Sequence, residues 1–212
     1  MIFIPTGIRG KVINNLFYEL TGFVLNTKED FYRYRILPAR PLETFYGNAG
    51  ETKRFGLETY VDWKPLRDVK IQLAYTYSHF KYTRTSKDSM LTGGEMLPAI
   101  VKGNYLPNSP EHQFYLEIEY KFLRHFVLGL SSEYQSKWYV YTNRNITQNG
   151  FNLYHARISY QFKIGNLSSD ISIYGKNLTD QEYIAFTEPD PDGNSYQPGA
   201  KRELFGSLRI RF

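Results

Sequence analysis

The segment that comes closest to a metal site is the acidic stretch 188–194, which reads Glu-Pro-Asp-Pro-Asp-Gly-Asn. Carboxylate and amide oxygens in such an alternation are the ligands of a calcium-binding loop. Counted from Asp190 as the first position, however, the sixth position is Ser195 instead of glycine and the twelfth is Lys201 instead of glutamate. An EF-hand is therefore excluded. We interpret the stretch as a solvated, turn-rich loop, with weak calcium binding between loops as the open alternative.

No other group of residues has the types and spacing of a catalytic centre. The absence of cysteine removes disulfides, thiolate metal sites and thiol catalysis together. The sequence also lacks the HExxH, CxxC, GxSxG and phosphate-binding P-loop motifs. The four histidines are far apart in the chain, at His79, His112, His125 and His155. We therefore expect no enzyme, no cofactor and no bound metal.

The composition excludes several other classes of protein. Aromatic residues make up 17% of the 212 residues, with 19 Tyr and 15 Phe against 2 Trp, while hydrophobic residues total 42%. The clean apolar runs, such as 126–130, are far shorter than the ~20 residues of a membrane-spanning helix. A chain this rich in Tyr, Phe, Ile and Leu has enough apolar surface to fold. The net charge of +5 includes no run of five like charges, which argues against a nucleic-acid tail.

The dominant pattern is the period-two alternation of β-strands with two unlike faces. In the segment 114–122, Phe and aliphatic residues occupy every second position, and Glu117, Glu119 and Lys121 lie between them. A helix would scatter these charges around its axis, so the pattern indicates a strand. The same test predicts nine strands and no helix of three turns. The strands are expected at about 8–13, 16–35, 50–63, 69–85, 112–122, 126–142, 151–162, 170–187 and 202–212.

The links between these strands alternate between short and long. The short links are 14–15, 64–68, 123–125 and 163–169, and the long links are 36–49, 86–111, 143–150 and 188–201. Outer-membrane barrels have tight periplasmic turns and long extracellular loops, whereas a soluble sandwich has no reason to place every long loop at one end. The alternation predicts an all-β, antiparallel transmembrane barrel. A soluble antiparallel sandwich has the same strand period and stays open as the alternative.

In a barrel, the two faces of each strand would meet different surroundings. We expect the apolar face to meet lipid and the charged face to meet water in the lumen, the latter carrying Glu117, Glu119, Arg157, Arg209 and Arg211. Aromatic residues at strand ends are typical of the girdles at the two membrane interfaces. The segments 75–77 and 138–141 are candidates for such girdles.

Three segments resemble parts of one known family, the TonB-dependent outer-membrane receptors. The segment 170–183 ends in Asn177, Leu178, Thr179, Asp180 and Tyr183, which resembles the family's "NLTDxxY" motif late in the barrel. The segment 48–58 is similar to the family's "NxGxxxxxGxE" strand. The terminal segment 202–212 resembles the family's last strand, whose final aromatic residue is read by the barrel assembly machinery. On this strand the signal would comprise Gly206, Leu208, Ile210 and Phe212.

The resemblance implies a 22-stranded barrel with an N-terminal plug. It also implies uptake of a scarce ligand such as a ferric siderophore, with energy relayed by TonB through a box near the N-terminus. The plug, the box and the first barrel strands are not in this sequence, and neither is a signal peptide. We therefore expect residues 1–212 to be the C-terminal segment of a receptor barrel, inactive as an isolated chain.

The expected function is that of an outer-membrane active-transport receptor in a Gram-negative bacterium. Its expected partners are a ferric siderophore, TonB through the missing part, the barrel assembly machinery, the lipid bilayer and lipopolysaccharide, with no nucleic acid. The candidate ligand-binding residues are Tyr46, Arg84 and Tyr196, because an anionic iron chelate favours Arg donors and aromatic platforms. The competing interpretation is that basic residues of the outer rim contact anionic lipid head groups. The alternative functions are a soluble all-β module that binds polyanions or sugars, and an unrelated porin-like channel.

Overall fold

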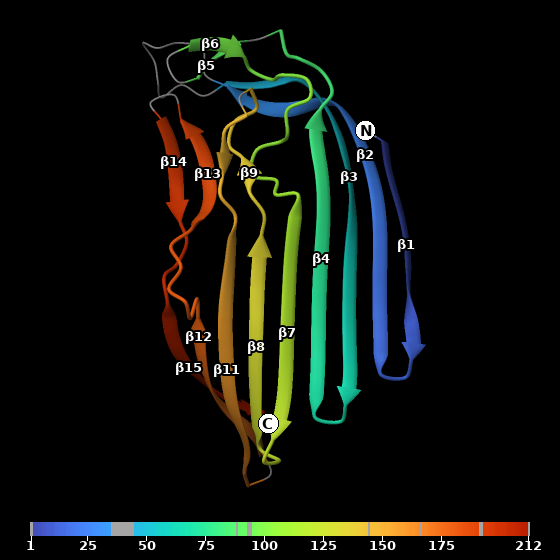
Figure 1. Ribbon diagram of the computed structural model, residues 1–212, viewed down its shortest axis with the longest axis vertical. Helices are drawn as coiled ribbons and strands as arrows, with labels where there is room; N and C mark the ends of the chain where they lie inside the picture. The colour runs from blue at the N-terminus through green and yellow to red at the C-terminus, as the bar shows by residue number, and fades with distance from the viewer. Residues whose placement is uncertain are drawn as a thin grey trace.

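The computed structural model describes residues 2–34, 45–87, 89–92, 95–143, 145–165, 167–190 and 193–211, and within them every regular element is a β-strand. None of these residues forms a helix long and apolar enough to cross a membrane. Nine strands form one antiparallel sheet in which chain neighbours pair (Figure 1). They are β1 (Ile2–Ile13), β2 (Leu16–Tyr34), β3 (Phe45–Leu66), β4 (Val69–Tyr82), β7 (His112–Phe122), β8 (Phe126–Gln135), β11 (Phe151–Ile164), β12 (Leu167–Lys176) and β15 (Glu203–Arg211).

Three small hairpins lie outside this sheet, within the long links at one end of the molecule (Figure 1). They are β5 (Ser89–Thr92) with β6 (Glu95–Pro98), β9 (Trp138–Tyr139) with β10 (Thr147–Gln148), and β13 (Ile184–Asp190) with β14 (Gly193–Pro198). The opposite end has only tight turns, between β1 and β2, β3 and β4, β7 and β8, and β11 and β12. The predicted alternation of short and long links is therefore confirmed.

Each of the nine predicted strands corresponds to one strand of the sheet, but the ends of four differ clearly. The segments 8–13 and 50–63 were predicted too short, because β1 begins at Ile2 and β3 extends over Phe45–Leu66, and two other segments were predicted too long. The segment 126–142 leaves the sheet after Gln135, because the chain turns away to bury Trp138 and Val140 among the long links. The segment 170–187 leaves the sheet after Lys176, where Asn177 adopts a positive φ of 47°, outside the extended region typical of strands, and the chain turns away. Its last residues belong to β13 instead.

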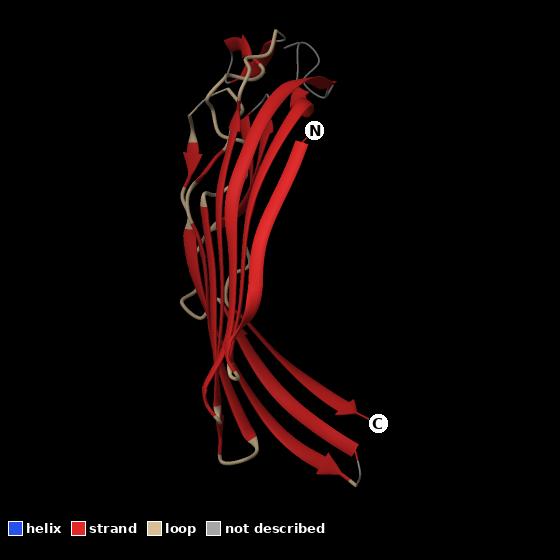
Figure 2. Ribbon diagram, turned by 90° about the vertical axis from the view of Figure 1, so that its right-hand side faces the viewer, coloured by secondary structure: helices blue, strands red, loops and turns tan. Residues whose placement is uncertain are grey.

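The sheet is a curved, open wall whose two edge strands, β1 and β15, each have one neighbour among the described strands (Figure 2). Its apolar face is uncovered, so that Ile118 is 38%, Ile171 50% and Leu208 61% exposed. A soluble sandwich would bury such a face against a second sheet, and no described strand does so. The apolar face is instead suited to lipid.

Aromatic side chains form two belts on the apolar face. Near the tight turns, Phe122 stacks on Tyr120 and Phe126, with ring centroids 6.0 and 5.4 Å apart. Near the long links, His112 lies against Tyr75 and Tyr77, at 6.2 and 5.3 Å. Tyr120 and His112 are on the same strand, roughly 26 Å apart at the strand rise per residue. That spacing, shortened by strand tilt, suits the apolar band of a barrel.

Most of the described buried apolar residues lie among the long links, whereas Val127 and Leu153 are buried on β8 and β11 of the sheet. Ile100 and Ala99 are fully buried beside Tyr82, and Trp138 is only 1% exposed. The segment 138–141 was predicted to join an aromatic girdle, and for Trp138 and Tyr141 this is wrong, because both are buried among the long links. We call the described parts of the links 83–111, 136–150 and 177–202 the loop cap.

Candidate functional site

A charged cluster occupies the polar face of the sheet at its centre. The strand register places Glu119, Gly129 and Arg157 in one row across β7, β8 and β11. The guanidinium of Arg157 forms an ion pair with Glu119 and lies 3.7 Å from Glu117. The hydroxyl of Tyr115 donates a hydrogen bond of 2.7 Å to Glu117. The sequence therefore predicted correctly that Glu117, Glu119 and Arg157 share a face.

The cluster borders a cavity of about 360 Å³ that reaches the loop cap. Its wall includes His155, whose Nδ1 accepts a hydrogen bond of 3.1 Å from the backbone N–H of Asn177. This leaves the proton on Nε2, a buried atom without a hydrogen-bond partner, 3.5 Å from a carboxylate oxygen of Glu133. Carboxylates, phenols and one guanidinium thus face a polar, water-accessible space. Such a surface can hold a polar ligand or a complementary protein surface.

The described residues contain no group of three His, Cys, Asp or Glu side chains that could hold a metal ion. The described residues of the acidic stretch lie at the ends of β13 and β14, where the backbone of Pro189 pairs with Asn194 and that of Asp190 with Gly193. Residues 191 and 192 are outside the described residues. The interpretation of this stretch as a solvated, turn-rich loop stays a prediction.

The motif 177–183 forms a compact corner between the sheet and the loop cap. Asn177 is 2% exposed, and its amide group donates to the carbonyls of Gln181 and Ala200 and accepts from the N–H of Gln181, at 2.9, 3.1 and 2.9 Å. Asp180, also at positive φ, accepts a hydrogen bond of 2.8 Å from the N–H of Arg202. These bonds hold the segment that leads into β15. Thr179 is exposed, and Leu178 is partly exposed.

Tyr183 completes this corner. Its ring lies 4.5 Å from that of Phe151 and covers Gly199, where an added Cβ would lie 2.0 Å from the ring. Burial, together with the negative charge of Glu133 and Glu203, raises the pKa of Tyr183, which keeps the phenol neutral. The position therefore requires glycine, because only a residue without a side chain fits beneath the ring of Tyr183.

Among the polar contacts that join distant segments of the loop cap, one group centres on Thr187. The amide group of Asn108 donates to the carbonyl of Thr187 at 2.6 Å and accepts from its N–H and hydroxyl at 3.0 and 2.8 Å. The indole N–H of Trp138 donates to the same hydroxyl at 3.3 Å. Three long links thus meet at Thr187, which is fully buried. Reasoning from the sequence missed this contact, because Asn108 and Thr187 are separated by 79 positions.

The three residues predicted to bind ligand lie at the end of the sheet with the long links. Arg84 follows β4, is 55% exposed and lies 3.4 Å from a carboxylate oxygen of Glu51. Tyr196 is in β14 and is 42% exposed. The backbone of Tyr46 belongs to β3, and its side chain is outside the described residues. The role of these three residues in ligand binding stays a prediction.

The model of the family described as "TonB dependent receptor-like, beta-barrel" matches residues 6–178. The chain belongs to this family. The resemblance seen in the sequence is therefore confirmed, and so is the all-β barrel fold, although the barrel is not closed by these nine strands.

Solved structures of several receptors and transporters have a similar fold. The siderophore receptor PiuA from Acinetobacter baumannii is 21% identical, with a TM-score of 0.76 over 99% of this chain and 28% of its own. The ferric yersiniabactin uptake receptor FyuA from Yersinia pestis is 15% identical, with a TM-score of 0.75 over 99% and 29%. The ferric citrate transporter FecA is 21% identical, with a TM-score of 0.74 over 99% and 31%. The chain thus spans less than a third of each receptor.

Proposed function

We propose that residues 1–212 are the C-terminal segment of an outer-membrane receptor barrel that imports a ferric siderophore with energy relayed by TonB. The observation that carries the proposal is the division of one sheet into an uncovered apolar face and a charged face that leads to a packed loop cap. The family membership and the ferric-chelate receptors among the similar structures support it. The unpaired edges of β1 and β15 support the presence of further barrel strands in the working receptor.

In this proposal the charged face lines a polar lumen, and the cap forms part of the outer mouth. The row of Glu119, Gly129 and Arg157 would face the plug domain, which carries the contact with TonB. The apolar face and its aromatic belts would meet the bilayer of a Gram-negative outer membrane, with lipopolysaccharide at the outer belt. A receptor with this architecture transports its ligand and carries out no chemistry on it.

The exposed edge strand β15 is the proposed element for assembly. Gly206, Leu208 and Ile210 share the apolar face of this strand, and Leu208 is 61% exposed. Phe212 lies outside the described residues. An apolar, unpaired edge can add to another β-strand, so we propose that the barrel assembly machinery recognises it before the barrel closes.

Uptake by the complete receptor tests the proposed function. A strain that lacks the receptor would be complemented with the full-length protein, and uptake of radiolabelled iron would be measured with a panel of ferric siderophores and ferric citrate. The proposal expects uptake of at least one chelate, abolished when TonB is deleted. Outer-membrane insertion without TonB-dependent uptake of any chelate would refute the iron assignment, and free diffusion of small solutes would favour a porin-like channel.

Arg84 tests the proposed position of the ligand site. The substitution Arg84→Glu removes a guanidinium that could contact an anionic chelate and places a second carboxylate beside Glu51. Uptake by the full receptor should fall, with a raised KM. Lys137→Glu makes the same charge change at another exposed position of the cap and is the control. Unchanged uptake by the Arg84 variant would remove this residue from the site.

A further inference from the structure

The positive charge of the chain is concentrated at the end with the tight turns. Within three residues of the four turns the sequence has one carboxylate, Asp68, and seven cations: Lys11, Lys64, Arg67, Lys70, Lys121, Arg124 and Lys163. This region has a net charge of +6, against +5 for the whole chain. The remainder is therefore nearly neutral. In barrels of this architecture the tight turns face the periplasm.

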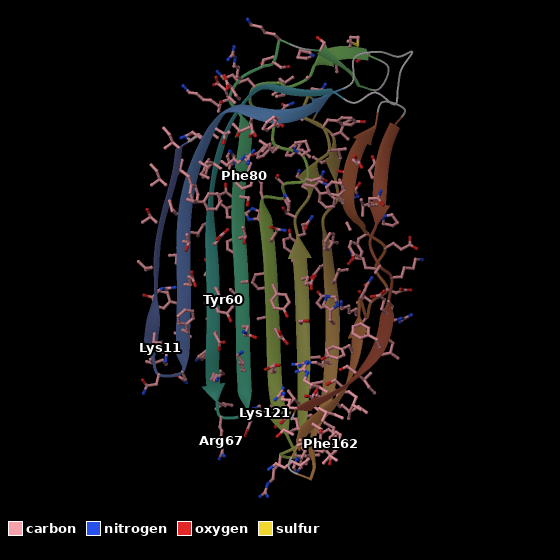
Figure 3. The ribbon with its side chains drawn as sticks, turned by 180° about the vertical axis from the view of Figure 1, so that it is seen from behind. Lys11, Tyr60, Arg67, Phe80, Lys121 and Phe162 are labelled. Carbon is pink, nitrogen blue, oxygen red and sulfur yellow. The ribbon has the colours of Figure 1, made fainter. Side chains whose placement is uncertain are left out.

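Three of these cations line one open groove between two neighbouring turns. The groove has a volume of about 1000 Å³ and is bounded by Arg67 and Asp68 of one turn and by residues 120–124 of the next. The backbone N–H of Lys121 donates a hydrogen bond of 2.8 Å to the carbonyl of Asp68, which joins the two turns. Arg67 and Lys121 are labelled at adjacent turns in Figure 3. Among the described residues, no carboxylate lies within ion-pair distance of Arg67, Lys121 or Arg124.

The second turn holds its residues in an unfavourable backbone conformation. Leu123 and Arg124 have φ angles of 48° and 62°, a pair of left-handed residues that tight hairpins usually build from Asn and Gly. Side chains with a Cβ disfavour this region by about 1 kcal/mol or more each. The turn nevertheless presents the most exposed large hydrophobic residue described at this end, Leu123 at 75%, directly beside Arg124 in the chain. A strained, amphipathic turn of this kind suggests a functional constraint.

We propose that this groove binds an anionic glycerophospholipid of the periplasmic leaflet. Arginine presents a planar fork that matches phosphate. Lys121, which belongs to the charged face of β7, lines the groove from the other side of the sheet end and adds a third positive charge. The groove is continuous with the apolar face through Tyr120 and Phe122, whose stacked rings provide a wall for acyl chains. The exposed Leu123 extends this apolar surface toward the head-group region. The cations thus sit where the phosphate of a membrane lipid would lie.

Native mass spectrometry of the full-length receptor would test this proposal. Phosphatidylglycerol, phosphatidylethanolamine and lipid A would be titrated separately, and the dissociation constant of the first bound lipid would be measured for each. The double substitution Arg67→Gln with Arg124→Gln removes two cations from the groove. Each interfacial cation contributes about fivefold to the binding of anionic lipid, so the affinity for phosphatidylglycerol should fall about 30-fold. Affinity for phosphatidylethanolamine should change much less.

The matched control is Lys102→Gln with Lys137→Gln, which removes the same charge at the opposite end and should leave phosphatidylglycerol binding unchanged. Equal weakening by both variants would show a general effect of net charge and overturn the proposal. Unchanged affinity of the groove variant for phosphatidylglycerol would also overturn the proposal. A loss of affinity for lipid A as large as the loss for phosphatidylglycerol would overturn it as well. The proposal rests on the proposed membrane placement, and failure of that placement would be seen separately, as a receptor that does not insert into vesicles.

Discussion

The guanidinium of Arg157 on β11 reaches the carboxylate of Glu119 on β7, two strands away, by passing over Gly129 on β8. A Cβ at Gly129 would lie 3.3 Å from Nε of Arg157. The missing side chain therefore provides the path for the ion pair. Both partners are about a quarter exposed, so the pair is partly screened by solvent.

Arg157→Ala should lower the free energy of unfolding by about 1 to 2 kcal/mol, because it leaves Glu117 and Glu119 close together without a counter-charge. Urea unfolding of the full receptor, followed by its heat-modifiable mobility on gels, measures the change. Adding Glu119→Gln to this variant should restore part of the loss. Arg209→Ala removes a cation from the same face that has no ion pair among the described residues, and it should change the midpoint little.

Gly129→Val should disturb the same contact from the strand between the partners. The branched side chain would occupy the path of Arg157, so the ion pair with Glu119 should break even though both charged residues are present. Combined with Arg157→Ala, the substitution should cost little more than Arg157→Ala alone, and a double-mutant cycle measures this coupling. Fully additive losses would show that Gly129 matters only for strand packing.

Asn177→Ala should open the corner that leads into β15. The change removes three hydrogen bonds of a buried amide and disfavours the positive φ, at a cost of about 3 kcal/mol. Hydrogen exchange of the backbone amides in 199–203 should become about 100-fold faster at that cost. Asn177→Gly still allows the positive φ but lacks the amide group, so it should show most of the increase in hydrogen exchange. Thr179→Ala changes an exposed neighbour and should show no increase.

Asn108→Ala should loosen the loop cap and leave the sheet intact. Three hydrogen bonds to Thr187 disappear, and the buried N–H and carbonyl of that residue lose their partners. Limited proteolysis should cut the links 83–111 and 177–202 at least tenfold faster, with an unchanged urea midpoint for the barrel. Ser109→Ala is the adjacent control. Equal protease resistance of the two variants would contradict a joining role for Asn108.

The two tryptophans should report opposite surroundings. Trp63 is 39% exposed on the apolar face close to a tight turn, and Trp138 is 1% exposed in the loop cap. Vesicles of lipids brominated near the head group should quench the fluorescence of Trp63 strongly and that of Trp138 not at all. The variants Trp138→Phe and Trp63→Phe, each of which removes the other tryptophan, measure the two effects separately. Quenching of both alike would contradict the assignment of the apolar face to lipid.

The strands and their faces could be predicted from the sequence because they depend on a local period of two. The segment 114–122 separates charged from apolar residues without any knowledge of its neighbours, and the pairing of chain-adjacent strands follows from the tight turns between them. The same local reasoning predicted that the strands 126–142 and 170–187 continue past the points where they leave the sheet. Where the chain leaves the sheet depends on distant partners, such as Ala200 for Asn177 and Thr187 for Trp138.

The sequence by itself therefore determined the all-β fold, the two unlike faces, the alternation of link lengths and the family, all of which are recorded in patterns along the chain. Only the tertiary structure decided that Arg157 reaches Glu119 over Gly129, that Asn108 joins the long links at Thr187, and that the cations of two turns line one groove. These relationships depend on the register between strands and on contacts across many residues. No local period specifies them, because each becomes favourable only when the folded sheet holds its partners together.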